Sequence, residues 1–97
     1  MLIRLHGMLR AGSDVRQIDI SVPDEATVDS ALAAALAQEP RAAVVLLDSA
    51  SQLRSNLMIL RNGRDIRWLQ GMDTPLTALD RLDLFIQTGA QRAFAVD

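Results

Sequence analysis

Few residues of this sequence could do chemistry of their own. The single histidine, His6, has no serine or cysteine nucleophile motif beside it and so lacks the partners of a hydrolytic triad. The absence of cysteine excludes thiolate catalysis, thiolate metal sites and disulfides. All ten basic residues are arginines, which excludes lysine Schiff bases and isopeptide acceptors. We therefore expect a protein that is not an enzyme and carries no cofactor.

The carboxylates and glycines also give no pattern of a metal or phosphate site. With one histidine and no cysteine, a metal would need carboxylates alone, and Asp24-Glu25 and Asp80 with Asp83 are more typical of a turn and a strand edge. The glycines are isolated in turns and form no phosphate cradle. His6 is expected to be a solvated or hydrogen-bonded side chain.

Length and composition indicate one ordinary folded domain. The chain has 97 residues, 49% of them hydrophobic and 23% charged, so residues 1–97 are expected to form a single domain with 88–97 as a C-terminal tail. The net charge of −2 argues against a nucleic-acid partner. No leader pattern and no membrane-length apolar run is present, so we expect no membrane association and a cytoplasmic location.

The N-terminal half changes from an alternating pattern to a helical one. Residues 1–9 and 15–22 alternate apolar and polar side chains around a turn, which predicts a hairpin of two strands. From Val28 to Leu36 the apolar residues follow the spacing of an amphipathic helix, with Thr27 as its cap and Pro40 as its stop.

The C-terminal half predicts more strands. Residues 42–47 are apolar without a clear period, so they form either a short helix or a packed loop. Residues 57–61 are typical of a strand, Asn62-Gly63 of a tight hairpin turn, residues 65–69 of a short return strand, and residues 82–86 of a last strand. This order predicts an α+β fold of the β-grasp (ubiquitin-like) type, a mixed sheet of four to five strands with one main helix packed on one face.

The runs Ile59-Leu60-Arg61-Asn62-Gly63-Arg64-Asp65-Ile66 and Leu69-Gln70-Gly71-Met72-Asp73-Thr74-Pro75-Leu76 carry a resemblance to a known family. They are similar to the small sulfur-carrier subunit of molybdopterin synthase, which shares the β-grasp fold with the thiamine sulfur carrier and ubiquitin. In that family a ubiquitin-activating-type enzyme adenylates the C-terminal carboxylate, which becomes a thiocarboxylate. The resemblance implies a larger enzyme subunit as partner, synthase-like or activating-enzyme-like, and thus a hetero-oligomer.

The sequence departs from the family at its reactive end. Family members end in two glycines, which let the tail thread a narrow channel. Counting from Phe85, those positions are Ala90 and Gln91, after Gly89, and the chain runs on to Asp97. As written it is not expected to be thiocarboxylated, although trimming near Gly89 or Ala90 would restore a small-residue end. The sequence leaves open whether residues 92–97 form a lid, an extra strand or a frayed end.

Strand alternation directs Phe85 to the sheet face opposite the helix, where the resembled family docks its large partner. Either Met58 and Leu60 or Leu57 and Ile59 would join it, unless the tail covers this face. Arg61 and Arg64 lie around the hairpin, as a solvated rim or as a contact for an acidic partner. Trp68 would either plug the core or flank the same patch.

Three functions are therefore compatible with the sequence. The first is a docking module in molybdenum or tungsten cofactor biosynthesis, or in a related sulfur-transfer assembly. The second is a sulfur carrier that is active only after C-terminal processing near Gly89 or Ala90. The third is a permanent small β-grasp subunit of an oxidoreductase complex.

Overall fold

The computed structural model describes residues 1–87, which form a five-stranded mixed sheet with helices packed against it. The strands are β1 (Leu2–Leu5), β2 (Gln17–Asp19), β3 (Leu57–Arg61), β4 (Arg64–Asp65) and β5 (Arg81–Ile86). The α-helices are α1 (Met8–Ala11), α2 (Val28–Gln38) and α3 (Ala43–Leu46). The 3₁₀ helices are η1 (Pro40–Ala42), η2 (Ile66–Trp68) and η3 (Gly71–Asp73).

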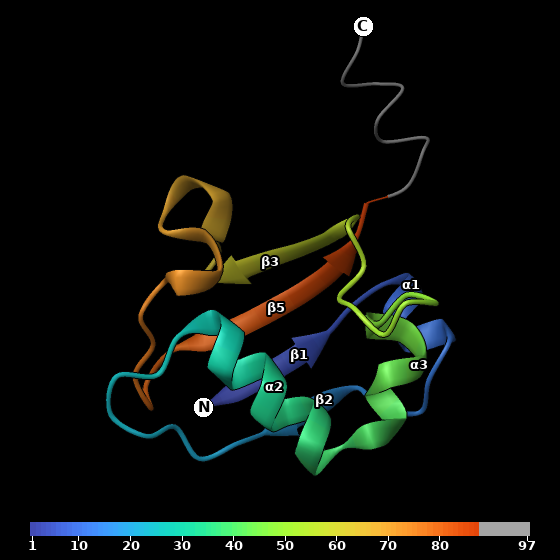
Figure 1. Cartoon of the computed structure of the whole chain (residues 1–97), viewed down its shortest axis with the longest axis horizontal. Helices are drawn as coiled ribbons and strands as arrows, with labels where there is room; N and C mark the ends of the chain where they lie inside the picture. Colours follow the sequence, from blue (N-terminus) through green and yellow to red (C-terminus); the bar gives the residue numbers. More distant parts are fainter. Residues whose placement is uncertain (88–97) are drawn as a thin grey trace, which may run out of the picture.

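Strand β5 lies at the centre of the sheet, whose order is β2-β1-β5-β3-β4 (Figure 1). It pairs in parallel with β1 on one side and antiparallel with β3 on the other. The first and last strands of the described chain are thus neighbours, and the outer pairs β1-β2 and β3-β4 are antiparallel hairpins. This is the predicted α+β, β-grasp arrangement.

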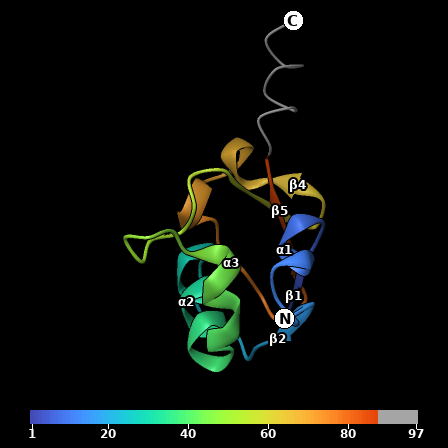
Figure 2. The same ribbon diagram turned by 90° about the vertical axis from the view of Figure 1, so that its right-hand side faces the viewer.

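Helix α2 packs across one face of this sheet, and α3 lies on the same side (Figure 2). The predicted cap is present: the Thr27 side chain accepts from the Ser30 amide at 3.2 Å, and the Ser30 hydroxyl accepts from the Thr27 amide at 2.9 Å. These bonds satisfy two backbone donors that would otherwise lack partners at the helix start. The helix ends at Gln38, before Pro40, as its sequence predicts.

The core lies between α2 and the sheet. Its fully buried side chains come from both layers and from α1 and α3: Ile3, Leu5, Leu9, Val28, Leu32, Leu46, Leu82 and Leu84. Along β5 the buried Leu82 and Leu84 alternate with residues of the opposite sheet face, because successive strand side chains point to opposite sides. The spacing that buries the core therefore also fixes which residues face outward.

The Asn62-Gly63 turn forms as predicted, with positive φ angles of 51° and 87°. Two hydrogen bonds connect the turn to the start of β5. The Asn62 amide donates to the Arg81 carbonyl at 2.9 Å, and the Asn62 side-chain oxygen accepts from the Arg81 amide at 2.9 Å. This anchoring fixes the position of the β3-β4 hairpin relative to the central strand.

Two local expectations are wrong, and one open alternative, at Trp68, is settled. The first strand ends at Leu5, because the chain turns at Gly7 with a positive φ of 58° into the short helix α1. The predicted return strand at 65–69 is limited to Arg64–Asp65; the Asp65 side chain then caps the Arg67 amide and starts η2. Trp68 is 82% exposed and does not plug the core.

The open alternative at residues 42–47 is also settled, since η1 and α3 make this segment helical. Ala42 and Leu46 are fully buried there, whereas Val44 is 69% exposed, so apolar side chains on both faces of the segment hide its helical period. Among residues 1–87 no helix is long and apolar enough to cross a membrane.

Candidate functional site

The sheet face opposite α2 carries the residues that the sequence singles out around Phe85. Phe85 pairs with Met58 across β3 and β5, and Leu60 pairs with Asp83. Directly opposed residues of an antiparallel pair share a sheet face, so Met58 and Leu60 join Phe85. Leu57 packs against the core cluster and Ile59 belongs to it. We call Met58, Leu60, Asp83, Phe85 and His6 the open face.

His6 and Phe85 form the centre of the open face. Their rings are stacked, with centroids 4.6 Å apart and planes inclined by 11°. The contact arises because β1 runs beside β5, and the His6 amide donates to the Leu84 carbonyl at 3.0 Å. Stacking restricts the rotamers of Phe85, so its ring is held in place before any partner arrives.

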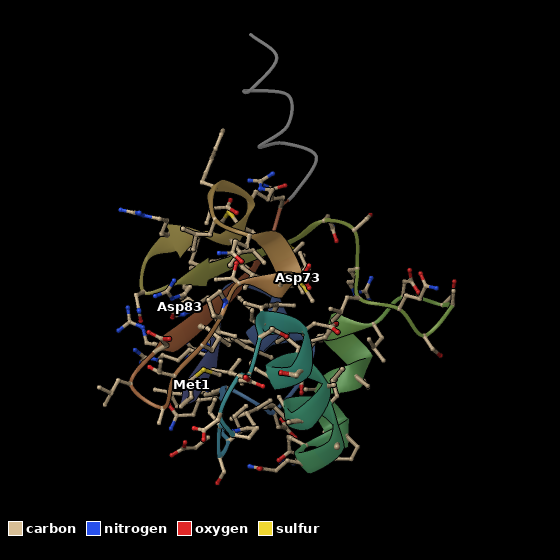
Figure 3. All side chains as sticks on the ribbon, turned by 60° about the vertical axis from the view of Figure 1, so that its left-hand side comes forward. Met1, Asp73 and Asp83 are labelled. Carbon is tan, nitrogen blue, oxygen red and sulfur yellow. The ribbon has the colours of Figure 1, made fainter. Side chains whose placement is uncertain are left out.

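The carboxylate of Asp83 also holds His6 in place. His6 Nε2 donates to Asp83 Oδ1 at 2.7 Å, and Arg81 Nε donates to Asp83 Oδ2 at 2.9 Å. Asp83 is buried, and Figure 3 shows it on the side of the ribbon away from α2, near side chains that end in nitrogen. Sequence reasoning placed His6 and Asp83 on strands but did not bring them together. The available signal was an acidic residue inside an otherwise apolar central strand.

Opposing effects act on the pKa of the Asp83 carboxyl. Burial disfavours the charged form and would raise the pKa, but the hydrogen bonds from His6 and Arg81 and the charge of Arg81 outweigh it. The pKa is therefore held below its usual range. At neutral pH Asp83 is an ionised acceptor that orients both neighbours.

This depressed pKa predicts a loss of stability in acid. The unfolded chain binds the Asp83 proton more readily than the folded one, so the contribution is complete above about pH 4 and is lost as pH falls through the lower folded-state pKa. We expect the difference in unfolding free energy between the wild type and Asp83→Asn, measured by urea unfolding, to shrink with falling pH. The exposed Asp24→Asn is the control. A difference independent of pH would contradict this account.

Arg61 and Arg64 lie at the β3-β4 hairpin, on the sheet face of Leu82 and not on the open face. They are direct cross-strand partners, and Arg61 also pairs with Leu82 near the start of β5, whereas Phe85 pairs with Met58 near the start of β3. The two arginines, with Asn62 and Leu69, line a hollow of about 220 Å³. We call it the arginine hollow.

The remaining predicted positions, Gly89, Ala90 and Gln91, lie outside the described residues. Within residues 1–87 no group of three histidine, cysteine or acidic side chains is placed to hold a metal ion. The described part presents the side chains of the open face on one side of the sheet and the arginine hollow on the other.

Comparison with known proteins gives a family and a set of structural relatives. The model of the ThiS family matches residues 3–86. The crystal structure of SAMP1, the small archaeal modifier protein 1 of Haloferax volcanii, is similar with a TM-score of 0.75 and 25% identity over 92% of this chain and 96% of that one. A search of curated proteins gave no match.

Two further solved structures show the same fold. SAMP1 of Methanosarcina acetivorans has a TM-score of 0.70 and 21% identity, covering 91% of this chain and 92% of its own. Urm1 of Sulfolobus solfataricus has a TM-score of 0.58 and 23% identity, covering 90% of this chain and all of its own.

Proposed function

Because the chain belongs to the ThiS family of ubiquitin-like sulfur carriers, we propose that it acts as a protein-docking module of a sulfur-transfer assembly. Its partner is a larger enzyme subunit, of synthase or activating-enzyme type. The sequence resemblance favours an assembly of molybdenum or tungsten cofactor biosynthesis. The protein positions itself on that partner and catalyses no reaction.

The observation that carries the proposal is the construction of the open face. Phe85 stands beside Met58, and its ring is locked against His6, which Asp83 holds in turn. A rigid aromatic side chain loses little conformational entropy on binding and is a typical anchor of protein interfaces. A hydrogen-bonded network behind an aromatic residue gives such a surface a defined shape.

The C-terminal sequence supports docking over sulfur donation by the unprocessed chain. Ala90 and Gln91 stand where the resembled carriers have glycines. A glutamine side chain and the residues beyond it would collide with the walls of a channel that admits only an extended glycine tail. The tail as written does not suit adenylation.

The relatives favour a second candidate function. SAMP1 of Haloferax volcanii is named as a modifier protein, and the similarity covers almost the full length of both chains. In this alternative, trimming near Gly89 or Ala90 exposes a small-residue C-terminus that is then activated, for sulfur transfer or for attachment to another protein.

Intact mass spectrometry of the protein purified from its native host separates these candidates. The docking module predicts the full-length mass together with stable co-purification of one large partner. A mass that lacks the last residues and contains sulfur in place of one carboxylate oxygen would favour the processed carrier. A trimmed chain joined covalently to another protein would favour the modifier.

A further inference from the structure

Arg61, which lines the arginine hollow, has a side-chain donor that the described chain leaves without a hydrogen-bond acceptor. Arg61 Nε is buried and forms no hydrogen bond to any atom of residues 1–87. Its ion-pair partner, Asp80 Oδ2, is 3.7 Å from Nε, which is too far for a hydrogen bond. A buried donor without an acceptor is unfavourable, and such groups in native proteins are usually satisfied by water or a ligand.

Asp80 does not turn toward Arg61 because other donors already hold its oxygens. Asn62 Nδ2 donates to Oδ1 at 2.8 Å, and the Thr77 amide donates to Oδ2 at 2.7 Å. Burial would raise the pKa of this carboxyl, but these hydrogen bonds and the charge of Arg61 together lower it. Asp80 therefore stays ionised at neutral pH and in its present orientation.

Arg64, on the facing strand, is available as well. It is exposed and forms no ion pair with the described residues, whereas nearby Arg67 is bound to Asp65 at 2.7 Å. The side-chain amide of Asn62 is already hydrogen-bonded, since its nitrogen donates to Asp80 and its oxygen accepts from the Arg81 backbone. The donors at the hollow that have no hydrogen-bond acceptor within residues 1–87 therefore belong to the guanidinium groups of Arg61 and Arg64.

The charge balance of the hollow specifies a singly charged anion. The two arginines that line the hollow carry two positive charges, and Asp80, the ion-pair partner of Arg61, offsets one of them. We propose that the arginine hollow binds the carboxylate of an aspartate or glutamate side chain of the docking partner, with Arg61 and Arg64 as donors. Arginine and carboxylate are matched in geometry. A phosphate of higher charge would be only partly neutralised. The assignment of this carboxylate to the partner rests on the proposed function. Because the hollow lies on the sheet face opposite the open face, a partner that contacts both must extend around the edge strand β4.

The anion site can be tested on the isolated protein. The Nε–H resonances of Arg61 and Arg64 are followed by ¹H–¹⁵N NMR during titration with sodium acetate, with sodium chloride keeping the ionic strength constant. We expect saturable shifts at both arginines. Arg64→Gln should raise the apparent dissociation constant for acetate about tenfold at Arg61. Arg10→Gln, which removes the same charge from the exposed face of α1, should leave it unchanged.

Other outcomes would overturn the proposal. Shifts that do not saturate, or equal acetate binding by Arg64→Gln and the wild type, would show that the hollow is no carboxylate site. Tighter binding of inorganic phosphate than of acetate would assign it to free phosphate instead. Acetate binding as expected, with undiminished capture of the partner by Arg64→Gln, would refute the assignment to the partner. The titration needs no partner, so its result is independent of the test of the open face.

Discussion

Phe85→Asp is expected to abolish capture of the large partner while the domain stays folded. Phe85 is half-buried on the open face, so its removal deletes an apolar anchor without opening a cavity in the core. Loss of a central aromatic anchor costs about 2 kcal/mol or more of binding free energy, roughly a thirtyfold loss of affinity. A carboxylate at this position would also require desolvation against the partner. Pull-down from the native host, followed by titration with the purified partner, measures the effect.

The control for this substitution is Leu79→Asp. Leu79 is 95% exposed in the loop before β5 and is not part of the open face, so the same change from apolar to acidic should not affect capture. The carboxylate introduced by Phe85→Asp would lie on the same sheet face as Asp83, and the two negative charges would repel each other. Phe85→Gln is therefore a neutral second variant, and the far-ultraviolet circular dichroism of each variant reports its fold. Equal recovery of the partner by all of them would remove the open face from the proposed function.

Elements with a strong local pattern could be predicted from the sequence. The α2 stripe, its Thr27 cap and its stop before Pro40 depend on residues close together in the chain, as does the Asn62-Gly63 turn. Each has one conformation that satisfies the local hydrogen bonds and buries the apolar side chains. The register with β5 shows that Met58 and Leu60 lie on the open face, because register decides which residues share a face.

The interior of the site could not be predicted in the same way. His6 and Asp83 are separated by 77 positions, and their contact exists only because the first strand pairs in parallel with the last. The predicted β-grasp fold implies that β1 and β5 are neighbours, but it does not give the register between them. A shift of one residue would have directed Asp83 into the core and removed its bond to His6.

The segment that follows β4 departs from the predicted strand for a local reason. Residues 65–69 contain apolar side chains suited to a strand, but the Asp65 carboxylate accepts from the Arg67 amide at 2.9 Å and favours a turn over continued pairing. Ile66 then reaches the core from η2, and Trp68 is left outside. Alternation in so short a run does not distinguish a strand from a 3₁₀ turn.

Leu84→Ala should lower the free energy of unfolding by about 3 kcal/mol, a large share of the roughly 5–15 kcal/mol that stabilises a typical small domain. Leu84 has no exposed surface, and its neighbours across the sheet are Leu5 on β1 and Ile59 on β3. Removing its side chain leaves a cavity beside the central strand. Because β5 is paired with a strand on each side, it cannot move inward to close that cavity.

Urea unfolding followed by circular dichroism measures this loss, and Leu79→Ala is its matched control, since the same atoms are removed from a side chain that is 95% exposed. That change should stay within about 0.5 kcal/mol of the wild type. If Leu84→Ala also stayed within that range, β5 would not be the central strand of the core. Phe85 would then no longer be expected to face outward, because its position on the open face follows from the burial of its neighbour Leu84.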